Sequence, residues 1–391
     1  MQLYTKYKVV RSRTLLRTLF YSLLAISGLV FLGWVFWHAS DLAEPEPPLE
    51  HARSAPTNRP PFPITRPIPT NRPPPTAAPP PLPPLRPTTT VPPPTNPPAV
   101  SFPKSAGRTP QNVLEAQIAL TRSGISCGSI DGVMGSQTRA ALRAFQQLQG
   151  LPVTGELDAV TRNRLPLDTP PLGPYTLTSD DLARLRPVGR TWLEKAEQER
   201  LDYETALELV AEKSRSHPNL IRRLNPQLDW TNAVAGTVVQ VPQAAPGPPR
   251  GKVSFIRIHL TQKTLEAFDG RSNLVVHYPC SIARQVEKRP VGELHVAAIA
   301  ANPNYTFNPE VFPESSEARE LGRKLLLPAG PNNPVGTAWM SLDRPGYGIH
   351  GTPKPEDVGR TESHGCFRLA NWNAEQLLQM LTLGTPVFVE P

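Results

Sequence analysis

Proline is the feature that most limits what this chain can fold into. The 391 residues include fifty prolines, and half of them lie between Asp41 and Pro110. Proline has no backbone N–H and a fixed φ, so a segment this rich in it cannot build helix or sheet and favours extended polyproline II. Residues 39–108 are therefore predicted to be a disordered, semi-rigid linker, with the folded domains after it.

An uncharged stretch from Thr18 to Trp37 precedes this linker. Its twenty residues are about the length that crosses a bilayer as a helix. Five basic residues come before it and acidic residues follow, so its basic end should remain in the cytoplasm. We expect a cytoplasmic tail at 1–17, a transmembrane anchor at 18–38 and an exported remainder. A cleaved signal peptide is the alternative, although this apolar region is longer than usual.

The formal net charge of +8 does not indicate a nucleic-acid partner. The whole surplus lies in residues 1–110, and residues 111–391 carry 29 basic and 29 acidic side chains. Nucleic-acid binding requires basic residues gathered on a folded domain. No nucleic acid is therefore expected among the partners.

The three cysteines, Cys127, Cys280 and Cys366, are too few for a disulfide scaffold and match no structural zinc spacing. In an oxidising compartment, Cys127 and Cys280 can form a bridge that leaves Cys366 as the free thiol. Alternatively, both are small buried apolar side chains. The sequence leaves both possibilities open.

Residues 109–168 have the pattern of a small three-helix bundle. The first helix is expected to open at Thr109-Pro110, the second presents Leu142 and Phe145 on one face, and the third follows Asp158. The segment resembles the type 1 peptidoglycan-binding domain, which implies binding to cell wall. Turn and cap chemistry accounts equally well for each landmark taken singly. The landmarks are Gln117, Asp131-Gly132, Gly135, Thr138, Phe145-Gln146, Gly150-Leu151, Gly155, Asp158 and Thr161.

Residues 169–200 are predicted to be a connector, and residues 201–245 a second small unit. Ala206 and Leu209 mark one helix face, Pro218 begins a shorter helix, and an apolar strand follows Gly236. This ending resembles the second half of a LysM module, which implies a small α+β fold. No opening strand precedes the helix that follows Tyr203. Glycan binding and a packing or spacer role both remain open for this unit.

From residue 251 to 391 the pattern changes to short β-rich runs. Residues 253–258, 274–278, 294–299 and 387–389 alternate or cluster apolar side chains over strand lengths, whereas 373–381 favours a helix. A mainly β domain is therefore predicted at 251–391.

The run Ser363–Cys366, with His350 sixteen residues before the cysteine, predicts a cysteine nucleophile. A thiol attacks a carbonyl well only as a thiolate, so it needs a nearby base or cation that lowers its pKa. Gly365 permits close backbone approach, and N–H groups there can face a developing oxyanion. If this run is extended, Arg368 lies on the same face as Cys366, two residues before it, and can pair there with a substrate carboxylate. Zinc held by the histidines and the cysteine would leave Arg368 unexplained, so neither metal nor cofactor is expected.

These residues resemble the catalytic domain of the L,D-transpeptidases (YkuD-like). The resemblance rests on Tyr347–Thr352 and Ser363–Arg368, preceded in order by Pro290–Gly292, Asn302-Pro303 and Asn333–Gly336. Phe367 stands where the family more often has an aliphatic residue. The resemblance implies a β-sandwich fold.

The resemblance also implies roles around the thiol. Cys366 would be the nucleophile and His350 its general base, with the backbone carbonyl of Gly351 orienting the imidazole ring. His364 would shape the oxyanion region, and Gly365 would supply an oxyanion N–H.

The substrate-binding residues implied by the family are Tyr347, Ser363 and Arg368. The implied reaction is attack by the thiol on the bond between the third residue of a stem tetrapeptide and its terminal D-Ala. An amine of a neighbouring stem peptide then resolves the thioester into a 3→3 cross-link. Three alternatives remain: hydrolysis by an L,D-carboxypeptidase, transfer to a wall-anchored protein or D-amino acid, and a non-catalytic membrane-to-wall tether.

The expected partners are peptidoglycan stem peptides and glycan, and the cytoplasmic membrane through the N-terminal helix. The expected location is the inner membrane, crossed once, with the N-terminus in the cytoplasm. The catalytic domain would then lie in the periplasm or cell-wall space.

Overall fold

The computed structural model describes residues 107–247, 251–312, 315–361, 363 and 365–391. The predicted tail and anchor, and residues 39–106 of the predicted proline-rich linker, lie outside the described residues. The predicted end of the linker at 108 is wrong, because Arg108 exchanges backbone hydrogen bonds with Leu167 and so belongs to the first folded unit. Within the described ranges, no helix is both long and apolar enough to span a membrane.

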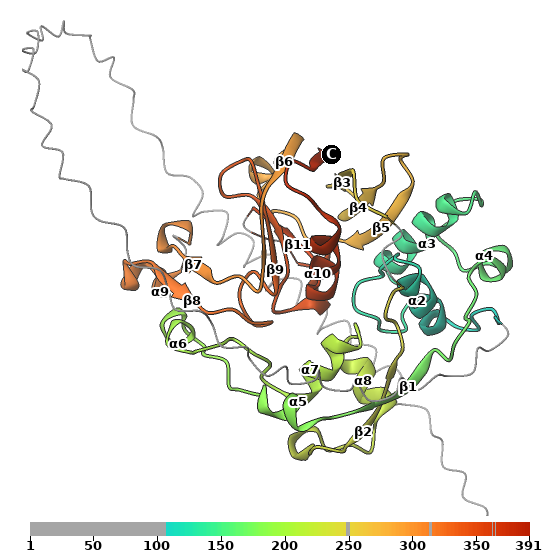
Figure 1. Cartoon of the computed structure of the whole chain (residues 1–391), viewed down its shortest axis with the longest axis horizontal. Coiled ribbons are helices and arrows are strands. Elements are labelled where there is room, and N and C mark those ends of the chain that lie inside the picture. Colours follow the sequence, from blue (N-terminus) through green and yellow to red (C-terminus); the bar gives the residue numbers. More distant parts are fainter. Residues whose placement is uncertain (1–106, 248–250, 313–314, 362, 364) are drawn as a thin grey trace, which may run out of the picture. The chain divides into compact units, whose positions relative to one another are not determined.

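The first folded unit contains the three expected helices, α2 (Val113–Arg122), α3 (Ser136–Leu148) and α4 (Ala159–Arg164) (Figure 1). The first helix begins at Val113 and not at the predicted Thr109-Pro110. Asn112 caps it, because its side chain accepts a hydrogen bond from the Glu115 N–H at 3.0 Å.

Two buried glutamines connect the landmarks of this unit. Gln117 on α2 accepts from the Gly132 N–H at 2.8 Å and donates to Thr138 Oγ1 at 2.9 Å. Gln146 on α3 repeats the arrangement, accepting from the Gly155 N–H at 2.8 Å and donating to Thr161 Oγ1 at 2.9 Å. Each glutamine ties its own helix to the next turn and helix, so these landmarks hold the bundle together.

A second unit, called here the middle module, runs from residue 172 to 242. Strands β1 (Leu172–Thr176) and β2 (Val238–Pro242) pair antiparallel, and α7 (Ala206–Lys213), α8 (Pro218–Leu224) and η1 (Trp230–Asn232) lie between them in sequence. The predicted connector at 169–200 is therefore wrong. It contains β1, which sequence analysis missed because α5 (Ser179–Ala183) and α6 (Trp192–Ala196) separate that strand from α7. The LysM resemblance stays a prediction.

The third unit is mainly β, as predicted. Eight strands pair in the order β11-β10-β9-β6-β12-β3-β4-β5, with β10–β11 and β12–β3 parallel and the others antiparallel. The bounds of these strands are β3 Phe255–His259, β4 Thr264–Phe268, β5 Leu274–Pro279, β6 Gly292–Ala301, β9 Ala338–Leu342, β10 Gly348–His350, β11 Phe367–Arg368 and β12 Pro386–Glu390. The remaining elements are η2 Val286–Lys288, β7 Tyr305–Phe307, η3 Pro309–Val311, α9 Ser316–Leu321, β8 Leu325–Leu327, η4 Pro355–Asp357 and α10 Asn371–Met380.

These strands form one curled sheet, and the implied two-layer sandwich is corrected accordingly. The chain just beyond β5 reaches the opposite edge, where Ser281 and Arg368 exchange backbone hydrogen bonds of 2.9 and 3.0 Å. Ser363 N–H also donates to the Ile282 carbonyl at 2.8 Å. The segment that carries the predicted nucleophile is therefore held between β10 and the chain after β5.

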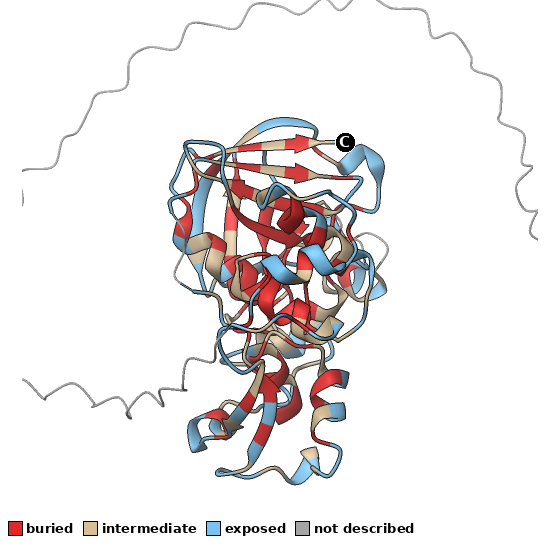
Figure 2. Ribbon diagram, turned by 90° about the vertical axis from the view of Figure 1, so that its right-hand side faces the viewer, coloured by how far each residue is buried: buried red, intermediate tan, exposed pale blue. Residues whose placement is uncertain are grey.

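The apolar core of this unit lies within the curl, against α10. Ile256, Met340 and Leu377 are fully buried and belong to one cluster that draws on the sheet and the helix. Figure 2 shows buried residues along the inner strands and helices and exposed residues in the loops. Full burial of one such side chain contributes about 1.5–3 kcal/mol to the free energy of folding. Burial of these side chains therefore stabilises the sheet that positions the site.

Cys127 and Cys280 are both buried and unbridged. Burial raises the pKa of each thiol well above its usual range. Of the two open possibilities, the structure has the buried apolar side chains.

Candidate active site

The parallel pairing of β10 and β11 brings the segment that carries Cys366 beside the strand that ends at His350. Ile349 pairs with Phe367, and both point into the core. Successive side chains of a strand alternate between its faces. His350 at the end of β10 therefore projects to the face opposite the core, as does its register partner Arg368. Cys366 lies in the bend just before β11.

The Cys366 thiol lies close to the start of β10. Its Sγ is 3.5 Å from the Gly346 carbonyl oxygen. Burial raises the pKa of this thiol, although a hydrogen bond from the Gly348 N–H and the positive charge of Arg368 both favour the thiolate. The sequence predicted a lowered pKa, and burial is the physical reason for the difference.

His350 is buried and oriented by its own strand end. Its Nδ1 is 2.6 Å from the Gly351 carbonyl oxygen, the contact that the family resemblance implied. The pKa of His350 is lowered to about 4, mainly by burial and also by the Arg368 charge, whereas the hydrogen bond to the Gly351 carbonyl raises it. The ring is therefore neutral at neutral pH. Because a carbonyl can only accept, Nδ1 carries the proton and Nε2 is left as an acceptor.

Trp339 covers the imidazole, which the sequence analysis did not predict. Its ring centroid lies 5.4 Å from that of His350, with 28° between the planes. A Cβ placed on Gly348 would lie 2.6 Å from the indole, so only glycine leaves room for it there. Trp339 and His350 lie opposite each other in the β9–β10 register, and a single sequence gives no signal for that register.

Ser363 and Gly365 shape the loop that presents the thiol. The Ser363 hydroxyl donates to the Cys366 carbonyl at 2.5 Å and accepts from the Gly365 N–H at 3.3 Å. Ser363 is buried, so these bonds define the loop more directly than any substrate contact. The substrate-binding role of Ser363 and the oxyanion role of Gly365 stay predictions. His364 lies outside the described residues.

Tyr347 and Arg368 lie on different sides of the thiol segment. Tyr347 packs against the core, and the Arg344 guanidinium lies 4.8 Å from its ring centroid. Arg368 lines a cavity of about 270 Å³. The phenol of Tyr305 on β7 is partly buried, within electrostatic reach of Cys366 and Arg368. The substrate contacts of Tyr347 and Arg368 stay predictions.

The middle module forms one wall of that cavity. Its lining residues are Trp192, Lys195, Ser281, Asn332, Pro334, Thr352, Pro353, Lys354, Asp357, Val358, Thr361 and Arg368. Trp192 on α6 stacks on Phe307 of β7 with ring centroids 4.3 Å apart, and the backbone N–H of Trp192 donates to the Glu317 carboxylate. Sequence analysis did not place α6 near the site, because that contact joins segments over a hundred residues apart.

A second cavity, of about 600 Å³, lies between the first helical unit and β1. Phe145, Arg164 and Leu172 contribute to its walls. The guanidinium of Arg122 beside it is already bonded to the carbonyls of Gln243, Thr169 and Pro170 at 2.7–3.0 Å. None of its lining residues belongs to the thiol site.

Comparison with known proteins identifies two segments. Residues 254–389 match the family model described as the L,D-transpeptidase catalytic domain, and residues 109–165 match a peptidoglycan binding domain. A Bacillus licheniformis protein with the name L,D-transpeptidase YkuD is 26% identical over 185 residues, which cover 47% of this chain and 93% of that protein. Escherichia coli YbiS, with the name probable L,D-transpeptidase, is 30% identical over 42% of this chain and 53% of its own length. An L,D-transpeptidase crystal structure from Xylanimonas cellulosilytica aligns at 17% identity with a TM-score of 0.32, over 75% of this chain and all of that one.

Proposed function

The chain contains an L,D-transpeptidase catalytic domain and a peptidoglycan-binding domain, and from this premise we propose that it forms 3→3 cross-links in peptidoglycan through a Cys366 acyl-enzyme. The observation that supports the proposal is that Cys366 directly precedes β11, which pairs in parallel with the strand ending at His350, and that the Arg368 charge acts on both groups. The Gly351 carbonyl holds the proton of His350 on Nδ1, which leaves Nε2 to act as the base.

The first half-reaction releases D-Ala from a stem tetrapeptide. Cys366 Sγ bonds to the carbonyl carbon of the third residue while His350 Nε2 takes the thiol proton. Collapse of the tetrahedral intermediate breaks the C–N bond, and His350 returns the proton to the departing D-Ala amine. A thioester between Cys366 and the remaining tripeptide results.

The second half-reaction uses an amine of a neighbouring stem peptide as the acceptor. The amine attacks the thioester carbonyl and loses a proton to His350, and the C–S bond breaks. The new amide is the cross-link, and the thiol recovers its proton. Arg368 on the wall of the 270 Å³ cavity is suited to pair with a stem-peptide carboxylate.

We also propose that residues 18–38 anchor the chain in the cytoplasmic membrane, with the folded units in the periplasm or cell-wall space. The support is the uncharged stretch with five basic residues before it. The proline-rich linker would then span the distance to the wall, and the peptidoglycan-binding domain would hold the catalytic domain against its substrate.

The test is to incubate the purified full-length chain with disaccharide tetrapeptides and to identify the products by mass spectrometry. We expect free D-Ala and a tetrapeptide–tripeptide dimer, both absent with Cys366→Ala. Tripeptide without dimer would assign hydrolysis instead. Release of D-Ala by Cys366→Ala would contradict the acyl-enzyme, and no release by the wild type would favour a tether.

A further inference from the structure

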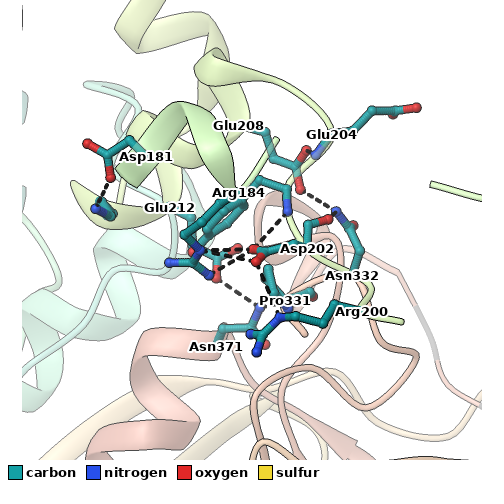
Figure 3. A network of polar contacts seen from close by, with 12 residues as sticks. Asp181, Arg184, Arg200, Asp202, Glu204, Glu208, Glu212, Pro331, Asn332 and Asn371 are labelled. Carbon is teal, nitrogen blue, oxygen red and sulfur yellow. Dashed lines mark hydrogen bonds and ion pairs between the residues drawn. The ribbon is translucent and has the colours of Figure 1, made fainter. Parts of the chain in front are cut away.

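One carboxylate of the middle module reaches into the catalytic domain. Glu212 lies in the last turn of α7, and its Oε1 accepts a hydrogen bond from Asn371 Nδ2 at 3.0 Å (Figure 3). Asn371 is the first residue of α10 and is fully buried. The two partners are 159 residues apart in sequence and belong to different units.

The side-chain amide of Asn371 has a single workable orientation. Its Oδ1 accepts from the backbone N–H groups of Thr352 at 2.9 Å and Thr337 at 3.3 Å. Its Nδ2 donates to Glu212 and to the Pro331 carbonyl at 3.3 Å. A flipped amide would set N–H against N–H on one side and oxygen against oxygen on the other. Glu212 is thus one of two acceptors that fix this orientation.

Thr352 N–H and the Gly351 carbonyl belong to the same planar peptide group. One end of that plane is held by Asn371 Oδ1, and the other accepts from His350 Nδ1 at 2.6 Å. Rotation of the plane would weaken both hydrogen bonds together. The space is also closed, because a Cβ on Gly351 would lie 2.2 Å from Asn371 Oδ1. Orientation of the imidazole therefore depends on the position of the Asn371 amide.

We propose that Glu212 is a positioning residue for His350, acting through Asn371 and the Gly351–Thr352 peptide group. The middle module would then be needed for the catalytic base to adopt its working orientation, in addition to any contact with the wall. Hydrogen bonds in such a chain polarise one another, so loss of the first weakens the last. The inference rests on the proposed role of His350 as base.

The middle module is attached to the catalytic domain close to Glu212, where this series of hydrogen bonds begins. Leu201 N–H donates to the Ala329 carbonyl at 3.0 Å, and Asn332 N–H donates to the Leu201 carbonyl at 2.9 Å. Glu208, one turn before Glu212, accepts from Asn332 Nδ2 at 2.6 Å. These contacts hold α7 against the loop before β9, so Glu212 meets Asn371 in a defined geometry.

The surroundings of Glu212 make its protonation relevant near neutral pH. The pKa of Glu212 is raised to about 8, mainly by burial and also by nearby carboxylates, whereas the hydrogen bond from Asn371 lowers it. The titratable or charged groups that face it are Glu208 on its own helix, Tyr203 before that helix, Glu375 on α10, and Glu356 and Lys354 at η4. Neutral and ionised Glu212 both accept from Asn371, and the ionised form accepts more strongly.

The test compares Glu212→Met, which removes the acceptor, with Glu212→Gln, which retains one. Asp181→Asn is the matched control: Asp181 binds Lys213 and Tyr175 within the middle module, so its loss weakens that module away from Asn371. In the full-length chain we expect Glu212→Met to lower kcat for D-Ala release at least about tenfold with little change in KM. Glu212→Gln should restore most of that loss, and Asp181→Asn should change stability only. Equal loss in Glu212→Gln and Glu212→Met, or in Asp181→Asn, would overturn the proposal.

A second measurement depends neither on turnover nor on whether Glu212→Met folds. The ¹H and ¹⁵N resonances of the His350 Nδ1–H group should shift between pH 7 and 9 in the wild type and stay constant in Glu212→Gln. A resonance that is constant in the wild type would contradict the relay. If no variant releases D-Ala while this shift is present, the proposed function fails and the positioning role stands.

Discussion

The indole of Trp339 lies against the imidazole of His350 across the β9–β10 pair, with ring centroids 5.4 Å apart. Stacking of this kind keeps water from one face of the ring. Burial is the main reason that the pKa of His350 falls to about 4. The tryptophan therefore contributes to the protonation state of His350 without contributing a proton acceptor of its own.

Trp339→Ala should raise the pKa of His350 from about 4 towards 6.5, because it admits water to the ring. The proposed mechanism requires neutral His350, so the acid limb of the kcat/KM profile for D-Ala release should move to higher pH. Trp230→Ala, in the middle-module core, removes an indole away from the site and should leave the limb in place. An unmoved limb in Trp339→Ala would show that the indole does not shield the base.

The depressed pKa of His350 also predicts a pH dependence of folding stability. The unfolded chain binds a proton at His350 near pH 6.5 and the folded chain only near pH 4. The stabilisation is therefore fully present above pH 6.5 and is lost as the pH falls from 6.5 towards 4. The free energy of unfolding of His350→Gln, measured by urea denaturation, should change less over that interval than that of the wild type. Parallel curves would contradict a buried neutral imidazole.

Arg368→Met should raise two pKa values at once. The guanidinium charge favours the thiolate of Cys366 and disfavours the imidazolium of His350, so its removal raises the pKa of both groups. The pH profile of Cys366 alkylation by iodoacetamide should shift to higher pH, and the acid limb of turnover should shift the same way. Arg368→Lys retains the charge and should retain both profiles. Shifts in opposite directions would rule out a shared electrostatic cause.

Glu212 predicts the opposite dependence of stability on pH to His350. The unfolded chain releases this proton near pH 4.5, whereas the folded chain retains it to about pH 8. Its stabilisation is present below pH 4.5 and is lost as the pH rises from 4.5 to 8. As the pH rises from 4.5 to 8, the free energy of unfolding of the wild type should therefore fall relative to that of Glu212→Gln. A constant difference between the two chains would mean that Glu212 titrates normally.

The sequence predicted the parts of the site that are local in the chain. Cys366 and His350 lie in two short motifs, and their spacing suggested a thiol with a basic partner, whereas the contact of His350 with the Gly351 carbonyl was implied by the family resemblance. Trp339 reaches His350 only through the pairing of β9 with β10, and a single sequence does not specify that pairing. The local pattern thus predicted candidate reactive groups, but not what surrounds them.

The contributions of the middle module were missed for a related reason. β1 was read as part of a connector because α5 and α6 separate it from the helices that complete its unit. Glu212 follows the apolar face of an amphipathic helix, where a charged residue usually points to solvent. Its burial arises from docking on α10, which no periodicity within α7 reveals. The thiol pKa was misjudged because motifs report neighbouring charges but not burial.

Gly336→Ala tests the packing around the Asn371 amide directly, with Gly384→Ala as its control. Both glycines have positive φ, +64° and +81°, so alanine at either position carries a backbone cost of about 1–2 kcal/mol. A Cβ on Gly384 meets open space, whereas one on Gly336 would lie 2.0 Å from Asn371 Oδ1 and 2.5 Å from Thr352 N. We expect urea unfolding to show a loss of about 1–2 kcal/mol for Gly384→Ala and about 2–5 kcal/mol for Gly336→Ala, because the second also displaces the amide. The displaced amide releases the Gly351–Thr352 peptide plane. Gly336→Ala should therefore also lower kcat with little change in KM, the result expected for Glu212→Met. Equal losses of stability and unchanged turnover in the two variants would mean that the Asn371 amide adjusts freely and does not hold His350.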